Sequence, residues 1–425
     1  MEIEITDEFA DAFNILENTN QHVFLGGKAG TGKSTFLTYF RENTSKNHVV
    51  LAPTGVSAIN VSGQTIHSFF KFKPWFTPNE LPKMRASQLK IYRAIETIII
   101  DEISMVRADI FDQIELFMRQ YGRLRGEPFG GCQICIIGDM YQLPPIVNKQ
   151  DAEVYYNFYE TPYFFSSNAF KNEAHQFVNI NFSKIFRQSE ADFIDILNKI
   201  RDGSITYDDL EWFNTECAKQ KELIEVQPIM LTATNYLARH TNQLRLKAIN
   251  SELYNYQAVA KGSFAKDQSK LPAEFNLELK VGAQVMFLRN DPDKRWVNGT
   301  IGVVSRLAAK VIFVLIDNIE VKLEPEKWES IKYQYNETEE KLSEEIIGSF
   351  KQYPLQLAWA VTIHKSQGKT FDYVEIDLGR GSFAFGQTYV ALSRCRSKNG
   401  IYLRTAIKLS DIQVDNRIIE FANNI

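Results

Sequence analysis

The stretch Gly27–Ser34 constrains the fold of this 425-residue chain more than any other feature of its sequence. It reads Gly-Lys-Ala-Gly-Thr-Gly-Lys-Ser, a pattern in which glycines let successive backbone N–H groups turn inward around phosphate oxygens. The pattern requires a strand before the loop and a helix after it. The apolar residues Val23–Leu25 precede it and a helical pattern begins at Lys33, so the chain is predicted to adopt an α/β fold that binds a nucleoside triphosphate.

The residue types in this loop predict how a triphosphate is held. The ammonium group of Lys33 would neutralise the β and γ oxygens, and the hydroxyl of Ser34 would bind Mg²⁺. The expected nucleotide-binding residues are Gly27, Ala29, Gly30, Thr31, Gly32, Lys33, Ser34 and Thr35.

A second strand pattern ends in two carboxylates. Thr97–Ile100 is largely apolar and β-branched, and Asp101 and Glu102 follow it directly. The carboxyl ends of parallel strands meet at one edge of a sheet, so Asp101 is expected beside the phosphate loop, where it would share Mg²⁺ with Ser34. Glu102 would then be the base that orients the attacking water.

Strand and helix patterns alternate along most of the chain, which predicts mostly parallel sheets covered by helices on both faces. The strands expected from short apolar runs are Val23–Leu25, Val49–Ala52, Thr97–Asp101, Gln133–Ile137, Phe177–Ile180, Ile229–Thr232 and Tyr373–Asp377. The helices expected from apolar residues three and four apart are Lys33–Arg41, Ile110–Tyr121 and Ala191–Arg201.

Two stretches break this alternation. Residues 71–93 carry six cations against the single acid Glu80, together with Trp75 and Phe76, and are expected to form a small basic insertion. The acidic stretch from Glu337 to Glu345 is expected to be a solvated helix face or a linker. Before it, a small antiparallel barrel or sandwich is predicted from the short strands Val281–Leu288, Gly302–Leu307, Val311–Ile316 and Ile319–Leu323.

The charge balance and the apolar runs exclude several classes of protein. Forty-eight basic and 52 acidic side chains give a net charge of −4, which excludes a polycationic surface but leaves room for a locally basic groove. The longest apolar runs are too short to span a bilayer and residues 1–25 show no basic leader, so no membrane partner is expected. Cys132 and Cys135 lie in an apolar run and are expected to be inert packing residues in a reducing compartment.

The tetrapeptide Asn148–Asp151 matches the guanine-reading element of small GTPases. Those proteins also need Asp-x-x-Gly after their second strand, whereas Asp101–Ser104 reads Asp-Glu-Ile-Ser. No apolar strand ends at Asn148, because Pro144 and Pro145 stand just before it. Recognition of GTP is therefore a poor alternative.

Six further motifs follow the phosphate loop in order. They are Ala52–Asn60, Gly63–Phe70, Gly138–Pro145, Ile185–Gln188, Thr362–Asp372 and Tyr389–Arg394. With these motifs the chain resembles the petite-integration-frequency (Pif-type) DNA helicases of superfamily 1B, relatives of the RecD-like enzymes, over nearly its whole length. Residues Arg123–Gly131 are similar to the signature that separates Pif-type from RecD-like enzymes.

The resemblance implies an α/β fold with two RecA-like P-loop domains, parallel sheets and ATP in the cleft between them. It also implies a small basic wedge insertion and an SH3-like β-barrel insertion. The first domain is expected over residues 1–70 and 94–183, with the wedge over residues 71–93. The second domain is expected over residues 184–275 and 350–425, with the barrel and an acidic linker over residues 276–349.

The resemblance also implies roles for several residues at the ATP site. Gln142 would sense the γ-phosphate from the first domain, while Arg187 and Arg394 would reach it from the second domain as arginine fingers. Ordinary surface ion pairing is the alternative for both arginines. Gly368 is a further expected nucleotide contact, and the family's upstream adenine-reading Gln has no counterpart in Asp7–Ala10.

Single-stranded DNA is expected across the tops of both domains, where cations and small polar groups bind phosphates and rings stack on bases. Phe69 and Trp75 are the candidate stacking rings, although Trp75 and its neighbour Phe76 fit equally well as anchors of the insertion. The residues that the resemblance places on the DNA are Thr54, His67, Ser68, Phe69, Trp75, His364, Lys365, Ser366 and Gln367.

The function implied by the resemblance is an ATP- and Mg²⁺-dependent DNA helicase that moves 5′ to 3′ on single strands and unwinds forked or tailed duplexes, with roles in DNA repair and telomere maintenance. The chain is expected to be monomeric and cytoplasmic. A bacterial or phage type is expected because no long extension precedes the phosphate loop. The alternatives are an ATP-hydrolysing DNA-binding protein that separates no strands, a small-molecule kinase or GTPase switch, and a motor on RNA, although nothing in the sequence provides a reader of the 2′-hydroxyl.

Overall fold

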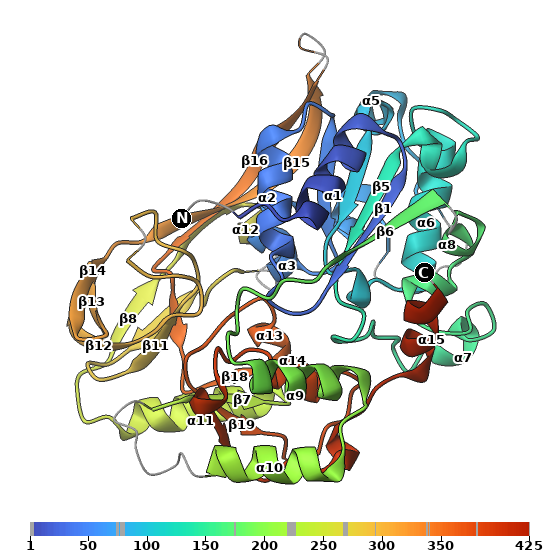
Figure 1. The fold of residues 1–425 in the computed structure, drawn as a ribbon. Coiled ribbons are helices and arrows are strands. Elements are labelled where there is room, and N and C mark those ends of the chain that lie inside the picture. The colour runs from blue at the N-terminus through green and yellow to red at the C-terminus, as the bar shows by residue number, and fades with distance from the viewer. Residues whose placement is uncertain are drawn as a thin grey trace.

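The structure is a computed structural model, and it describes residues 4–73, 76, 81–173, 176–218, 227–266, 271–293, 295–336, 339, 341–379 and 381–424. Two α/β units lie one above the other, and an antiparallel sheet lies beside them (Figure 1). We call the unit around the six-stranded sheet the first lobe and the unit around the four-stranded sheet the second lobe.

The first lobe is built on a parallel sheet in the order β3-β2-β4-β5-β1-β6. Its strands are β1 (His22–Gly27), β2 (His48–Ala52), β3 (Gln64–Thr65), β4 (Thr97–Ile100), β5 (Gln133–Ile137) and β6 (Phe177–Phe182). Because helices cover both faces, β1 and β5 are buried over their whole length and read in the sequence as short, mostly apolar runs. The five strands predicted in this region are confirmed.

Alternate residues of β1 point to two separate cores of the first lobe. Val23 and Leu25 lie in one core with residues of α1 and α2, whereas Phe24 lies in the other core with Phe111 and Phe117 of α6. The sheet is therefore covered on both faces, as predicted. The helices of this lobe are α1 (Asp7–Asn18), α2 (Lys33–Asn43), α3 (Gly55–Asn60), α4 (Ile66–Phe70), α5 (Leu89–Ala94), α6 (Ala108–Tyr121), α7 (Ala152–Tyr155) and α8 (Asn168–Glu173).

The second lobe is built on a smaller parallel sheet in the order β18-β7-β19-β20. Its strands are β7 (Ile229–Thr232), β18 (Ala360–Thr362), β19 (Val374–Asp377) and β20 (Ile401–Leu403). Its helices are α9 (Ala191–Asp202), α10 (Tyr207–Ala218), α11 (Asn235–Ala248), α13 (Ile363–Ser366) and α14 (Gln387–Leu392). The two strands and the helix predicted from the sequence of this region are confirmed.

The last helix, α15 (Asn416–Asn424), returns to the first lobe (Figure 1). Ile418 lies in the core of that lobe, and the ring of Phe421 stacks on Phe165 with 4.3 Å between centroids. The expected place of residues 416–424 in the second domain was therefore wrong, because their apolar side chains pack against the first lobe. The other domain limits stay predictions.

An antiparallel sheet in the order β14-β13-β12-β11-β17 stands beside the lobes. Its strands are β11 (Gln284–Phe287), β12 (Ile301–Ala308), β13 (Val311–Ile316), β14 (Ile319–Leu323) and β17 (Leu355–Leu357). Asp317 and Asn318 have φ of 45° and 63° and form the two-residue turn between β13 and β14, a conformation that tight hairpins prefer. The four strands predicted here are confirmed, and the closed SH3-like barrel stays a prediction.

A long hairpin reaches from this region to the first lobe (Figure 1). There the hydroxyl of Tyr333 accepts a hydrogen bond from the N–H of Val50 (3.1 Å), and Leu342 packs against the first core. The expected linker or helix face over Glu337–Glu345 was therefore wrong for residues 341–345, because they pair as a strand. The elements of this region are β8 (Tyr254–Gln257), β9 (Val259–Gly262), α12 (Ser263–Lys266), β10 (Asn276–Leu279) and the hairpin strands β15 (Glu326–Asn336) and β16 (Lys341–Gln352).

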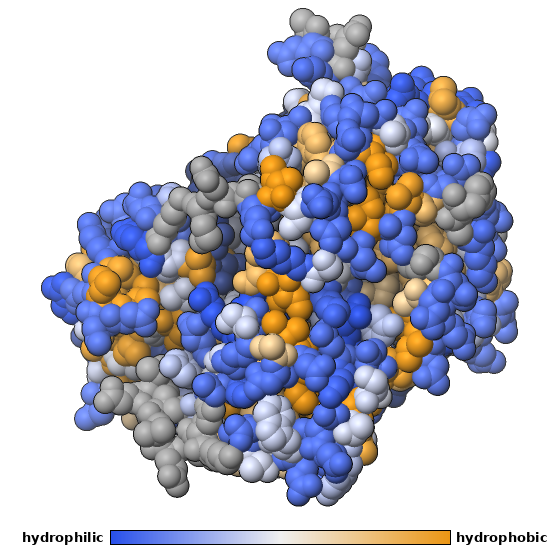
Figure 2. All heavy atoms as spheres, in the orientation of Figure 1, coloured by the Kyte–Doolittle hydropathy of each residue, from blue (hydrophilic) through white to orange (hydrophobic). Residues whose placement is uncertain are grey.

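The surface of the molecule is largely polar. Among the described residues, no helix combines the length and the apolar character needed to cross a bilayer. Figure 2 shows hydrophilic side chains over most of one face, with apolar groups in separate patches. One patch lies over the antiparallel sheet, where Val303, Leu315 and Ile319 are exposed. Some exposed apolar side chains are usual on protein surfaces.

His22 opens β1 and is buried among apolar side chains. Its Nδ1 accepts a hydrogen bond from the N–H of Ile134 (3.1 Å), and its ring packs against Phe129 and Phe177. Burial lowers the pKa of His22 to about 4. Because the pKa of an unfolded histidine is about 6.5, the neutral ring stabilises the fold fully above that pH, and this contribution is lost as the pH falls toward 4.

We expect the parent protein to lose about 2 kcal/mol more unfolding free energy than His22→Asn between pH 7.5 and pH 5. The amide oxygen of asparagine can accept the same hydrogen bond but does not titrate. Urea unfolding followed by circular dichroism at the two pH values measures the difference. Equal losses in the two proteins would contradict the assignment.

Candidate active site between the two lobes

The phosphate loop joins the end of β1 to the start of α2, as the sequence predicts. Gly30 and Gly32 have φ of 82° and 88°, in the left-handed region that favours glycine. A Cβ added at Gly30 would lie 2.6 Å from the Cβ of Arg187, so the backbone between β6 and α9 approaches the loop too closely for any side chain there. The ammonium group of Lys33 donates to the carbonyl oxygen of Gly27 (2.7 Å), which curls it over the loop.

Asp101 and Glu102 follow β4 at the same edge of the sheet as the loop. Burial raises the pKa of Asp101 to about 6, while burial and the charge of Asp101 raise the pKa of Glu102 to about 7. The positive charge of Lys33 acts against both shifts, so it lies close to both carboxyl groups. Glu102 has φ of 52° and ψ of 48°, and such a left-handed conformation costs a non-glycine residue about 1–3 kcal/mol and is concentrated at functional sites.

Asp139 is a third buried carboxylate, and it connects the two lobes. The hydroxyl of Tyr389 on α14 donates to its Oδ2 (3.0 Å), and Arg201 on α9 pairs with its Oδ1 (2.9 Å). Burial alone would raise the pKa of Asp139, but the charges of Arg201 and Lys33 hold it below its ordinary value. The Tyr389 hydroxyl also accepts a hydrogen bond from the N–H of Ala29 (3.0 Å), so the second lobe contacts the phosphate loop directly.

Arg187 and Arg394 lie together beside this contact. Arg394 is 1% exposed, and its Nε donates to the carbonyl oxygen of Val390 (2.9 Å). Arg187 donates through Nη1 to the carbonyl oxygen of Ser393 (3.1 Å). Burial lowers the pKa of both arginines, and among the described residues neither guanidinium pairs with a carboxylate. Two neighbouring guanidinium groups that are shielded from water and have no carboxylate partner favour the binding of an anion. This favours the anion-binding role over the alternative of surface ion pairing.

Gln367 joins the same site from the second lobe. It follows α13, and its Nε2 donates to Oε2 of Glu102 (3.1 Å) and to Oε1 of Gln142 (3.1 Å). Gln142 in turn donates to Asp139 (3.4 Å). Gly368 follows Gln367 in the chain, and a Cβ added to it would lie in open space. The sequence placed Gln367 among the DNA contacts, whereas the structure places its side chain against the expected base and the expected γ-phosphate sensor.

Several expected DNA contacts lie on short elements at the carboxyl edges of the two parallel sheets. Thr54 caps the start of α3 after β2. His67 and Ser68 lie on α4 after β3, where Ser68 is exposed. His364 and Lys365 lie on α13 after β18, where Lys365 is exposed. Both lobes thus present hydroxyl, imidazole or ammonium groups at corresponding edges.

The structure corrects two of the expected DNA contacts. Phe69 is 5% exposed and its ring packs in the first core, with 6.0 Å between its centroid and that of Tyr333, so it cannot stack on a base. Ser366 is fully buried, and its hydroxyl donates to the carbonyl oxygen of Ile363 (2.7 Å). Both predictions were wrong because these side chains face the interior of their lobes.

Trp75 lies outside the described residues, so its two interpretations stay open. The ring of its neighbour Phe76 packs against Tyr155 and Phe158, at 5.2 Å and 5.8 Å between centroids. Leu81 also packs against the first core. These contacts favour an anchoring role for Phe76.

The remaining loop residues fit a nucleotide with Mg²⁺. Thr31 is buried and donates to the carbonyl oxygen of Lys28 (3.0 Å), whereas Ser34 and Thr35 at the start of α2 are exposed. Within the described part of the chain, no cluster of three or more His, Cys, Asp or Glu side chains could hold a metal. Mg²⁺ in phosphate sites binds few protein oxygens and keeps several waters, so the hydroxyl of Ser34 and the carboxylate of Asp101 are a fitting donor set.

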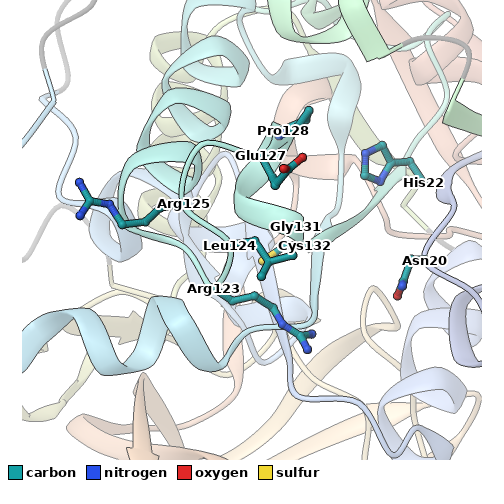
Figure 3. Close-up of a pocket in the computed structure, with 9 residues that line it drawn as sticks. All are labelled: Asn20, His22, Arg123, Leu124, Arg125, Glu127, Pro128, Gly131 and Cys132. Atoms are coloured by element: carbon teal, nitrogen blue, oxygen red, sulfur yellow. The ribbon is translucent and has the colours of Figure 1, made fainter.

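The signature-like segment Arg123–Gly131 lies at the opposite edge of the sheet from the phosphate loop. It lines a pocket of about 590 Å³ together with Asn20 and His22 at the start of β1 (Figure 3). The N–H of Leu124 donates to the carbonyl oxygen of Gly130 (2.9 Å), which closes the segment into a loop after α6. This segment places no side chain in the site between the lobes.

Sequence reasoning missed three residues of the site, namely Asp139, Arg201 and Tyr389. Asp139 and Tyr389 stand inside the motifs Gly138–Pro145 and Tyr389–Arg394. Their place in these motifs could have identified them as site residues. Arg201 is one of many helix cations and carried no such signal. Only the approach of the two lobes pairs it with Asp139.

Comparisons with known proteins show which family this chain belongs to. Residues 4–211 match the family model described as PIF1-like helicase, and residues 267–307 match that of the DNA helicase Pif1 2B domain. The chain is 32% identical to the ATP-dependent DNA helicase Pif1 of Bdellovibrio bacteriovorus, over 99% of this chain and 92% of that relative.

Two solved structures of Bacteroides Pif1 each cover 100% of this chain and 97% of their own. The complex with ADP-AlF4 is 37% identical with a TM-score of 0.90, and the complex with single-stranded DNA is 38% identical with a TM-score of 0.70. The two lobes are thus RecA-like P-loop domains. On the sequence identity and the shared fold, the chain belongs to the PIF1-like helicase family.

Proposed function

We propose that this chain is an ATP-dependent DNA helicase that moves 5′ to 3′ along single-stranded DNA and unwinds duplexes. The observation that carries the proposal is the meeting of two lobes at one phosphate loop. Lys33 and Glu102 come from the first lobe, and Arg394 of the second lies close enough for its charge to act on Glu102. The relatives with this fold are ATP-dependent DNA helicases, and Bacteroides Pif1 has been solved with ADP-AlF4 and with single-stranded DNA.

The groups around the loop account for hydrolysis of ATP. Lys33 neutralises the β and γ oxygens, Gln142 contacts the γ-phosphate and Glu102 takes the proton of the attacking water. The transferring phosphoryl group spreads negative charge over three oxygens, which Arg187 and Arg394 neutralise. Bound Mg²⁺ supplies further positive charge against the phosphate oxygens.

Closure of the lobes couples hydrolysis to movement. The bonds from Tyr389 to Ala29 and from Arg201 to Asp139 cross between the lobes, so the site is complete only when the lobes are together. A γ-phosphate that binds both lobes favours the closed state, and its loss removes that preference. A ligand shifts a conformational equilibrium only through such a difference in affinity. Alternating grip by the two lobes then advances the strand.

Single-stranded DNA and forked or tailed duplexes are the proposed substrates. Thr54, His67 and Ser68 of the first lobe, with His364 and Lys365 of the second, supply hydrogen bonds and charge for phosphates. Contacts of this kind tolerate any base sequence. We also propose that the chain acts as a monomer in a bacterial cytoplasm.

Unwinding of labelled duplexes with a 5′ tail, a 3′ tail or a fork tests the proposal. The expected result is strand displacement from the 5′-tailed and forked duplexes, only with ATP, and none by Lys33→Ala. Displacement from the 3′-tailed duplex would overturn the polarity. Hydrolysis stimulated by single-stranded DNA without any displacement would instead favour a DNA-binding ATPase that separates no strands.

A further inference from the structure

Gln367 connects the residues proposed for hydrolysis with the turn proposed for DNA binding. Its Nε2 carries two N–H donors, and both cross between the lobes, to Oε2 of Glu102 and Oε1 of Gln142 at 3.1 Å each. A carboxylate oxygen that accepts this bond competes less well for the proton of an attacking water. The contact therefore occupies one of the two carboxylate oxygens of Glu102, the expected base.

The turn before Gln367 carries the expected DNA contacts of the second lobe. α13 is one short turn after β18, in which His364 is half-buried and Lys365 is exposed. The N–H of Gln367 donates to the carbonyl oxygen of His364 (3.3 Å). A DNA phosphate that draws His364 or Lys365 toward the strand therefore also displaces the backbone of Gln367.

The backbone after Gln367 leaves room for this movement. Gly368 has φ of 77°, and no atom lies within 4 Å of the position of a Cβ. Glu102, by contrast, is held in its left-handed conformation, and its carbonyl oxygen accepts a hydrogen bond from the N–H of Met105 (3.0 Å). The open space beside Gly368 is thus room into which the turn that carries Gln367 can shift.

We propose that Gln367 is a positioning residue that holds Glu102 away from the attacking water until single-stranded DNA binds to α13. DNA binding moves Gln367 and releases the carboxylate of Glu102, so hydrolysis is coupled to occupancy of the DNA site. This inference rests on the proposed function, which assigns Glu102 as base and α13 as a DNA contact. A purely catalytic role, in which the amide orients Glu102 for the reaction, has the opposite consequence.

The DNA-free ATPase rate of Gln367→Leu tests the inference, because leucine removes the amide at nearly the same volume. We expect its kcat without DNA to rise about 5- to 150-fold, the factor that corresponds to typical coupling free energies, with KM for ATP unchanged. With saturating poly(dT) its rate is expected to match the parent's, so the stimulation by DNA falls by the same factor. A gain in rate is not a result that misfolding produces.

Two further variants sharpen this test. Gln367→Asn has an amide one methylene shorter that no longer spans the lobes, and it is expected to behave as Gln367→Leu does. Gln243→Leu removes an exposed glutamine on α11 and is expected to keep both rates of the parent.

A fall of both rates in Gln367→Leu would overturn the inference and assign the amide a catalytic role, and an unchanged DNA-free rate would overturn it as well. The parent protein separates this failure from that of the proposed function. If poly(dT) does not stimulate the parent, both fail. If the parent is stimulated normally while the variant keeps its low DNA-free rate, only the role of Gln367 fails.

Discussion

Glu102→Gln is expected to lower the DNA-stimulated rate of ATP hydrolysis by about 10²- to 10⁴-fold, the usual contribution of a general base. The substitution keeps the size of the side chain after β4 but removes the group that takes the proton of the attacking water. Binding of a fluorescent ATP analogue is expected to persist, because the phosphate loop and Lys33 are intact. Steady-state hydrolysis with poly(dT) and equilibrium titration with the analogue measure the two effects.

Glu127→Gln is the matched control for this prediction. Glu127 is exposed in the segment Arg123–Gly131, at the opposite edge of the first sheet, and its substitution is expected to leave the rate unchanged. A parent-like rate in Glu102→Gln would exclude Glu102 as the base.

Arg394→Ala is expected to lower the rate of the chemical step by about 10³- to 10⁵-fold, the range found for arginine fingers. Its guanidinium lies buried at the interface of the lobes, where little water screens the charge it offers to the γ-phosphate. Single-turnover hydrolysis with saturating single-stranded DNA measures the step without a contribution from product release.

Two variants control for charge and for folding in this experiment. Arg394→Lys keeps a positive charge but not the planar fork, and its rate is expected to fall between those of the parent and the alanine variant. Arg396 is exposed two residues later and pairs with Asp372 (3.3 Å), so Arg396→Ala is expected to keep the parent's rate. A folded Arg394→Ala protein with the parent's rate would assign the finger to another residue.

The parallel strands and the phosphate loop could be predicted because neighbouring residues determine them. Gln133–Ile137 reads as one short, mostly apolar run, and it forms β5 with the same limits because a strand buried on both faces needs such a run. Gly30 and Gly32 occupy backbone conformations that other residues adopt at a cost. Asp101 and Glu102 could be placed because the end of a parallel strand fixes their edge of the sheet.

The features that the sequence could not predict depend on contacts between segments that lie far apart in the chain. Phe69 stands in an expected DNA motif, but Tyr333 from the long hairpin covers it. Gln367 stands in another such motif, and only the approach of the lobes turns it toward Glu102. The C-terminal helix α15 places Ile418 in the first lobe for the same kind of reason. Local periodicity reports which face of an element is apolar and not which distant element covers it.

The central claim is that both lobes act on one triphosphate. A crystal structure of the chain with ADP, aluminium fluoride and a single DNA strand tests it most directly. We expect Arg187 and Arg394 both to donate hydrogen bonds to the fluoride ligands, and Glu102 to have exchanged Gln367 for a water molecule in line with the aluminium. Two guanidinium groups that stay bonded to Ser393 and its helix, away from the fluoride, would contradict the claim.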